Sequence, residues 1–297
     1  MDLNDPKIFR KFCSKGDAKR DEGLTTPDDI KRYDNISYGI HGELNLLDIY
    51  HKKNVADCQQ TIISIHGGGW VYGNKDVYQF YCMDLAQRGF TVVNFSYRLA
   101  PEAPFPAALE DVNRVFIWIA EHAKEYNIDL NNLFIVGDSA GAQLASQYMA
   151  MLTNYEFQKF YNFKVPSDKI KVKAGALNCG IYDLKKYVET SNDSFILAYL
   201  EEDAKGKLKY LDTMKYITKE FPPVFVSTAH NDFLKEHARP MYDKLKKLGV
   251  PCKYKIYGNK DNAKIAHVFH LDIRMPEAKE CNDEECEFFK KIIESEK

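Results

Sequence analysis

The residues best suited to chemistry lie at 137–141, where Gly-Asp-Ser-Ala-Gly matches the pattern G-x-S-x-G. The apolar run LFIVG at 133–137 predicts a strand, and AGAQLASQYMAML from Ala140 predicts a helix. A tight turn between strand and helix presents a serine hydroxyl at the carboxyl end of a sheet, and small flanking residues tolerate the strained backbone. Chance gives on the order of 0.03 such matches in a chain of this composition. We therefore predict that Ser139 is a nucleophile, with a chance loop match as the alternative.

A second glycine-rich segment, HGGGW at 66–70, follows the apolar run QTIISIH at 60–66. Three glycines let the backbone approach a ligand closely, and in acyl transfer their N–H groups can hold the developing oxyanion, where each donor contributes about 3 kcal/mol. A flexible turn or a phosphate loop is the alternative. Neither G-x-G-x-x-G nor G-x-x-x-x-G-K-[ST] occurs, so nucleotide binding has little support. We expect His66 to be structural because it precedes the serine.

A nucleophilic serine needs an acid and a base, which follow it along the chain in the order acid, then histidine, in folds with this motif. Asp232 comes just after the strand-like run VFVSTA, where a loop can direct its carboxylate toward the serine. Asp183 also follows a predicted strand, but it suits a helix N-cap equally well. Asp232 is the preferred acid and Asp183 the alternative.

Five histidines are candidates for the base: His66, His230, His237, His267 and His270. His237 falls inside a predicted helix, and His230 is too close in sequence to the preferred acid to face it. His267 and His270 both lie between the last predicted strand and the last helix, where the base is required. Their spacing alone does not choose between them.

Three motifs in this order and spacing resemble one known family: HGGGW at 66–70, YRLAPEAPFPAALEDV at 97–112 and GDSAG at 137–141. The chain resembles the hormone-sensitive-lipase-like branch of the α/β-hydrolase superfamily, and within it the bacterial carboxylesterases. The resemblance covers the core from about residue 60 to 295. It implies an α/β-hydrolase fold of about eight mostly parallel strands flanked by helices, with a small helical cap.

The resemblance also assigns site residues. It implies that the backbone N–H groups of Gly68, Gly69 and Ala140 form an oxyanion hole. The acid segment of the family corresponds to Asp232 and the residues after it. The family's histidine precedes a small residue and a phenylalanine, which the sequence His-Val-Phe at 267–269 matches, so His267 is the implied base.

The chain departs from the family pattern at two places near these residues. Phe233 occupies the position where the family has a proline, and the loop GNKDNAKIA at 258–266 is longer than the usual spacer before the histidine. We expect this loop to contribute to the rim of the substrate pocket. Four residues of the second cap region are expected to line or cover the acyl site, or to pack in the core: Phe195, Ile196, Tyr199 and Leu200.

The remaining pattern alternates strands and helices, which predicts a mostly parallel sheet covered on both faces. Residues 34–39 and 44–51 are expected to form an opening antiparallel pair. Two regions, 1–33 and about 179–220, interrupt the alternation, and we expect them to form the cap of a single domain that spans residues 1–297. Further elements are predicted at 76–88, 90–97, 106–126, 172–178, 224–228, 234–248, 253–257 and 276–293.

Composition argues against other classes of protein. The 297 residues carry 41 basic and 43 acidic side chains, a formal net charge of −2 that gives no basic surface for nucleic acid. Seven cysteines lack zinc-type spacing and are expected to be free thiols in a reducing compartment. Residues 1–22 lack the apolar run of a secretory signal, and the chain has no stretch of about 18 apolar residues, so we expect a cytoplasmic protein that does not bind membranes.

The sequence thus predicts a serine carboxylesterase that acts on small, short-acyl esters through an acyl-enzyme, with no metal or organic cofactor. An amide-directed hydrolase of the same fold, arylformamidase-like or peptidase-like, is the alternative. A non-catalytic ligand-binding protein on the same fold is disfavoured because serine, acid and histidine are all present. A small-molecule ester is the expected partner. The oligomeric state is open, with a homodimer as one alternative.

Overall fold

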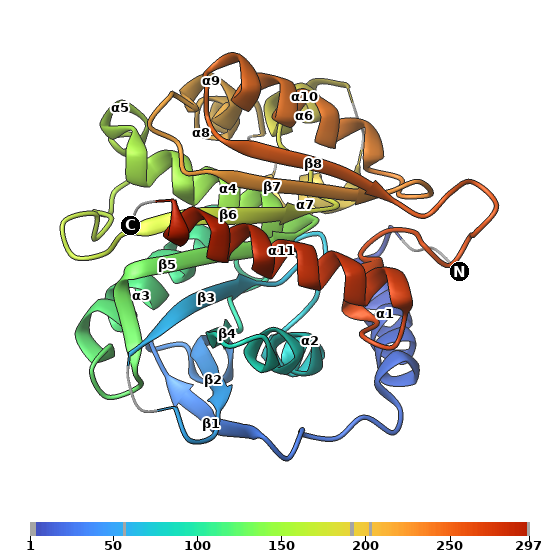
Figure 1. Ribbon diagram of the computed structural model, residues 1–297. Helices are drawn as coiled ribbons and strands as arrows, with labels where there is room; N and C mark the ends of the chain where they lie inside the picture. The colour runs from blue at the N-terminus through green and yellow to red at the C-terminus, as the bar shows by residue number, and fades with distance from the viewer. Residues whose placement is uncertain (1–3, 56–57, 191–192, 202–203, 296–297) are drawn as a thin grey trace.

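The computed structural model describes residues 4–55, 58–190, 193–201 and 204–295. Its centre is an eight-stranded sheet in the order β1-β2-β4-β3-β5-β6-β7-β8 (Figure 1). β2 runs antiparallel to its neighbours β1 and β4, and the pairs from β4 to β8 are parallel. The strands are β1 (Ile30–Ser37), β2 (Leu46–Lys52), β3 (Gln59–Ile65), β4 (Thr91–Phe95), β5 (Ile128–Asp138), β6 (Val172–Asn178), β7 (Val224–Ala229) and β8 (Cys252–Tyr257).

Helices cover both faces of the sheet, as the alternating sequence predicts. Adjacent residues of one strand point to opposite layers: Ile62 packs with α2 and α11, whereas Ile63 packs with α3, α4 and α10. The helices are α1 (Pro6–Asp21), α2 (Lys75–Gln87), α3 (Ala107–His122), α4 (Ala140–Thr153), α5 (Tyr155–Gln158), α6 (Leu184–Thr190), α7 (Ser194–Leu200), α8 (Ala204–Leu211), α9 (Thr213–Tyr216), α10 (Lys235–Lys247) and α11 (Pro276–Glu294), with short 3-10 turns η1 (Gly42–Asn45) and η2 (Phe269–Leu271).

The predicted elements are present with shifted ends, and the largest shift concerns the first strand. β1 begins at Ile30, so residues 30–33 belong to the sheet and not to the expected cap. Ile30 is buried and pairs with Lys52, but charged residues follow it along an edge strand that is half exposed. The strand therefore lacks the clean apolar alternation by which sequence identifies one.

α1 of the first expected cap region lies beside the carboxyl ends of the parallel strands, whereas the second region extends away from that edge to α9, which packs against α4 and α5 (Figure 1). Residues 1–3 of the first region, and 191–192 and 202–203 of the second, lie outside the described residues. α1 has no fully buried side chain and lies against the glycine-rich loop after β3, while α6 to α9 follow β6. Among the described residues, every helix is too short or too polar to cross a lipid bilayer.

Candidate active site

Ser139 occupies a strained turn between β5 and α4. Its backbone φ is 52° and ψ is −119°, a conformation that costs free energy for a residue with a side chain. The flanking glycines are required by space: a Cβ at Gly141 would lie 2.0 Å from the carbonyl oxygen of Ile65, and one at Gly137 would lie 2.5 Å from that of Gly141. The turn thus brings α4 directly against β3 and leaves the serine side chain 8% exposed in a cavity.

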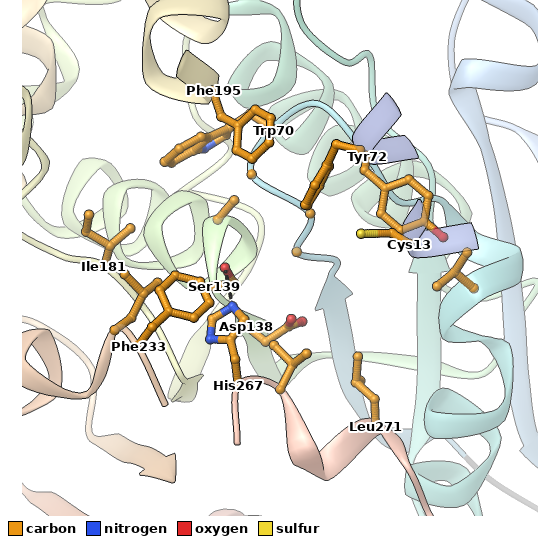
Figure 2. A pocket seen from close by; sticks show the side chains of 18 of the residues that line it. Cys13, Trp70, Tyr72, Asp138, Ser139, Ile181, Phe195, Phe233, His267 and Leu271 are labelled. Carbon is orange, nitrogen blue, oxygen red and sulfur yellow. Dashed lines mark hydrogen bonds between the residues drawn. The ribbon is translucent and has the colours of Figure 1, made fainter. Parts of the chain in front are cut away.

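Ser139, His267 and Asp232 form a continuous hydrogen-bonded chain. Nε2 of His267 lies 3.0 Å from Oγ of Ser139, and Nδ1 lies 2.7 Å from Oδ1 of Asp232. Figure 2 shows the serine and histidine side chains pointing toward one another inside the pocket. The three residues come from the loops after β5, β7 and β8, which end at the same edge of the parallel sheet.

Two further donors hold the Asp232 carboxylate. The hydroxyl of Thr228 donates to Oδ2 at 2.7 Å, and the backbone N–H of Leu234 donates to Oδ1 at 2.9 Å. Burial favours the neutral acid, but the hydrogen bonds and the charge of His267 outweigh it and hold the pKa of Asp232 below its usual value. The carboxylate is therefore charged at neutral pH and able to orient the imidazole.

The other candidate bases lie outside this chain. His270 is fully buried with its ring against Tyr81, and burial lowers its pKa to about 3, so it is neither the partner of Ser139 nor a surface residue. His66 is stacked on Tyr97 at 3.9 Å between ring centroids, and burial lowers its pKa to about 4.

The alternative acid is also accounted for. Asp183 accepts a hydrogen bond from the backbone N–H of Lys186 in the first turn of α6, at 3.1 Å. His237, on α10, has its ring against Tyr187 at 5.7 Å. Both side chains thus serve local structure.

The glycine loop after β3 lies beside Ser139. Gly68 and Gly69 have φ of 111° and 60°, and a Cβ at Gly68 would lie 2.1 Å from the carbonyl oxygen of Tyr72. Both glycines line the same cavity as Ser139 and Ala140. Across the described part of the chain, no protein group accepts a hydrogen bond from the N–H of Gly68, Gly69 or Ala140. These donors are available to a ligand.

Asp138 joins the glycine loop to the nucleophile turn, a role that the sequence analysis missed. The hydroxyl of Tyr78 donates to Oδ2 of Asp138 at 2.8 Å and accepts from the N–H of Gly67 at 2.8 Å. Burial raises the pKa of Asp138 to about 7, although Tyr78 and His267 act against this rise. The available signal was an acidic residue inside the motif itself, next to the serine.

A second buried carboxyl lies beneath the turn. Glu285 of α11 accepts hydrogen bonds from Nδ2 of Asn178 at 2.7 Å and from the hydroxyl of Tyr81 at 3.2 Å. The backbone carbonyl of the same asparagine accepts the N–H of Ser139 at 3.0 Å. Glu285 thus supports the end of β6, to which the backbone of Ser139 is hydrogen-bonded.

The cavity that contains the serine has a volume of about 460 Å³, within the range of small-molecule sites. One wall is α1, which the sequence analysis assigned only generally to a cap. Arg10 fastens this helix through hydrogen bonds to the carbonyl oxygens of Val71 and Ala100 and an ion pair with Glu102. The α1 residues that line the cavity are Phe9, Phe12, Cys13, Gly16 and Asp17.

The second expected cap region lines the cavity with Ile181, Tyr187, Asp193 and Phe195, and three of the four residues named from the sequence take the alternative of packing behind it. Phe195 lines the cavity, but Ile196 and Leu200 are buried in the main core. Tyr199 is stacked on Trp70 at 4.8 Å between ring centroids and so supports the wall from behind. The loop at 258–266 is absent from the residues that line the cavity, so the expectation that it forms the rim is wrong.

One cluster of potential metal ligands occurs among the described residues, formed by Cys179, Asp232 and His267. The acid and the histidine are already bonded to each other, and burial raises the pKa of the Cys179 thiol well above its usual value. A neutral thiol is a poor metal ligand. The cluster is therefore better described as the rear wall of the triad.

Solved structures of similar fold are esterases. Esterase B from Lactobacillus rhamnosis is 22% identical, with a TM-score of 0.88 over 98% of this chain and 96% of that one. A bacterial heroin esterase is 21% identical, with a TM-score of 0.78 over 98% and 93%. A fungal esterase from Rhizomucor miehei is 23% identical, with a TM-score of 0.74 over 99% and 92%. The α/β-hydrolase fold implied by the sequence resemblance is confirmed.

A family model described as BD-FAE matches residues 47–241. The match runs from β2 into α10 and includes the glycine loop, the nucleophile turn and the acid. It covers more than half of the chain. This protein therefore belongs to the BD-FAE family.

Proposed function

We propose that this protein is a serine carboxylesterase that hydrolyses small carboxylic esters with short acyl groups. The observation that carries the proposal is the hydrogen-bonded chain from Ser139 through His267 to Asp232, beside a cavity of about 460 Å³ that Ser139 and His267 line. The similar solved structures support it, since they are described as esterases, and esterase B has also been solved with a tributyrin phosphonate inhibitor.

The proposed reaction begins with attack of Ser139 Oγ on the acyl carbon of the ester. His267 Nε2 accepts the serine proton, and Asp232 stabilises the imidazolium through the hydrogen bond at Nδ1. When the tetrahedral intermediate collapses, the same Nε2 gives the proton to the departing alcohol oxygen. Water then attacks the acyl-enzyme with His267 as base, which releases the carboxylic acid and restores the serine.

The developing oxyanion is proposed to be held by the N–H groups of Gly68, Gly69 and Ala140. Their lack of protein acceptors supports this role. Ala140 is also the first residue of α4, so the positive end of the helix dipole faces the same position. The reaction as written requires no metal or organic cofactor.

The preference for short acyl groups rests on the size of the cavity, since a volume of about 460 Å³ must hold both the acyl group and the alcohol. On one side the cavity is bounded by Trp70, which is buried and stacked on the buried Tyr199. We also propose that α1 and the segment from α6 to α9 act as the cap of a single domain.

The seven free cysteines support a reducing location, the cytoplasm.

A panel of p-nitrophenyl esters from acetate to palmitate tests the function, with aryl formamides and acetylated sugars run in parallel. We expect kcat/KM to be highest for acetate or butyrate and to fall with longer acyl chains. Ser139→Ala, which removes only the hydroxyl, is the matched control and should lose about 10⁴-fold or more in kcat. Turnover of formamides that exceeds turnover of every ester would favour the amide-directed alternative.

A further inference from the structure

Phe233 is a large apolar side chain that the fold does not bury. It follows the acid Asp232 directly and is 75% exposed, yet it lines the cavity of Ser139. Its ring centroid lies 4.2 Å from that of the His267 imidazole, at an interplanar angle of 44°. Isolated exposed apolar residues are ordinary, but this one rests on the group that transfers the proton.

The backbone around Phe233 fixes this position. The N–H of Leu234 donates to the side chain of Asp232, and the N–H of Lys235 donates to the backbone carbonyl oxygen of Asp232 at 3.1 Å. Leu234 is turned inward, 7% exposed, and so leaves the preceding ring outside. The turn that holds the acid therefore also presents the phenylalanine to the cavity.

The chemistry of the proposed reaction determines which part of an ester meets this ring. His267 Nε2 must protonate the leaving alcohol oxygen, so that oxygen comes within about 3 Å of Nε2. A substituent on the oxygen then reaches the ring that packs on the imidazole. Figure 2 shows Phe233 beside His267 and Ile181, whereas Tyr72 and Cys13 lie on the opposite side of the serine.

We propose that Phe233 determines the alcohol specificity of the enzyme by packing against the leaving group, and that it favours esters of aromatic alcohols. The proposal rests on the esterase function. Two aromatic rings prefer an offset or edge-to-face arrangement, which the exposed and tilted ring can offer to a benzyl or phenyl group. Contact with substrate also buries apolar surface that the free protein leaves in water. The acyl group then lies on the other side of Ser139, where Tyr72 and Cys13 line the cavity.

Benzyl acetate and ethyl acetate test this assignment because they give the same acetyl-enzyme and differ only in the alcohol. In Phe233→Ala, kcat/KM for benzyl acetate should fall about five- to ten-fold, which is the loss expected when an aromatic contact and the apolar area that it buries are removed. For ethyl acetate, kcat/KM should fall less than about two-fold. The ratio of kcat/KM for ethyl butyrate to kcat/KM for ethyl acetate should be unchanged, because these two esters differ only in the acyl group. Phe233→Tyr should retain the benzyl preference, and Phe233→Leu should lose most of it.

Tyr155→Ala is the matched control, since this aromatic residue is 68% exposed and lies on α5. It should change neither ratio. An equal loss for both acetates in Phe233→Ala would overturn the proposal, because the ring would then only hold His267 in place. An unchanged benzyl preference would overturn it as well. Failure of the unaltered protein to hydrolyse any ester would instead refute the esterase function itself.

Discussion

Replacement of Glu285 by glutamine should make the protein progressively more stable, relative to the wild type, as the pH rises from 4.5 to 8. The carboxyl lies on α11, is fully buried, and accepts hydrogen bonds from Asn178 and Tyr81. Burial raises its pKa from 4.5 to about 7, although the two hydrogen bonds act in the opposite direction. Glutamine has nearly the same shape and carries no charge at any pH, so the substitution removes the titration. Its amide nitrogen cannot accept a hydrogen bond, so one of the two donors, Asn178 or Tyr81, loses its acceptor, a cost that is the same at every pH.

The sign follows from proton binding in the two states. Between pH 4.5 and about 7 the folded protein keeps a proton on Glu285 that the unfolded chain has released. The proton held by Glu285 therefore contributes to the free energy of unfolding at low pH, and this contribution is lost as the pH rises through this window. The difference between 4.5 and about 7, at 1.36 kcal/mol for each pH unit, corresponds to about 3 kcal/mol. The free energy of unfolding of Glu285→Gln minus that of the wild type should therefore be about 3 kcal/mol larger at pH 8 than at pH 4.5.

Urea unfolding at several pH values between 4.5 and 8.5 measures this difference directly. The wild type is subtracted at each pH, so the titrations of His66 and His270 cancel. Asp138 raises the pKa of Glu285 through its charge, so its own titration belongs to the measured difference. Glu294→Gln, an exposed acid in the last turn of the same helix, is the control and should give a small difference. A stability difference for Glu285→Gln that stays constant across the range would refute the reasoning, because the buried carboxyl would then titrate as it does in the unfolded chain.

Other predictions concern the site. Ser139→Ala should retain the urea midpoint of the wild type and lose labelling by a fluorophosphonate; labelling that persists elsewhere would contradict its assignment. His267→Ala should abolish hydrolysis of p-nitrophenyl acetate. His270→Leu should keep most of the activity, because it replaces a buried neutral ring whose two nitrogens have no partner among the described residues. The reverse result would exchange their roles. Thr228→Val should lower kcat about ten-fold with KM little changed, because it removes a charge-assisted hydrogen bond to Asp232; an unaltered kcat would show that the remaining donors suffice.

Local patterns were enough to predict the nucleophile turn. Its chemistry depends on a strand, five residues and a helix that are contiguous in the chain, so the motif and its structural context appear together. The same holds for the glycine loop, whose left-handed backbone at Gly68 and Gly69 only glycine adopts readily. Strands buried on both faces were equally readable, because their apolar runs are continuous.

The choice between His267 and His270 shows where sequence reasoning ends. The residues are three apart in a loop, and their spacing does not say which one faces the serine. Val268, between them, has φ of 52°, in the left-handed region, and turns the chain there. His267 then reaches Ser139, and His270 is carried beneath the sheet edge against Tyr81. A valine is an unfavourable residue for this conformation, so nothing local announces the turn.

The sequence by itself predicted the parallel strands and the strand–turn–helix at Ser139, since each depends on short-range periodicity or on a contiguous motif. Only the tertiary structure decided which face of α1 lines the cavity, that Glu285 supports the nucleophile turn, and that Phe233 lies on the imidazole. These contacts join residues that are between 34 and more than 100 positions apart in the chain. Whether such residues come into contact depends on how the whole sheet and its helices pack. The free energy that stabilises this packing comes from many interactions across the core and not from the residues next to each contact in the sequence.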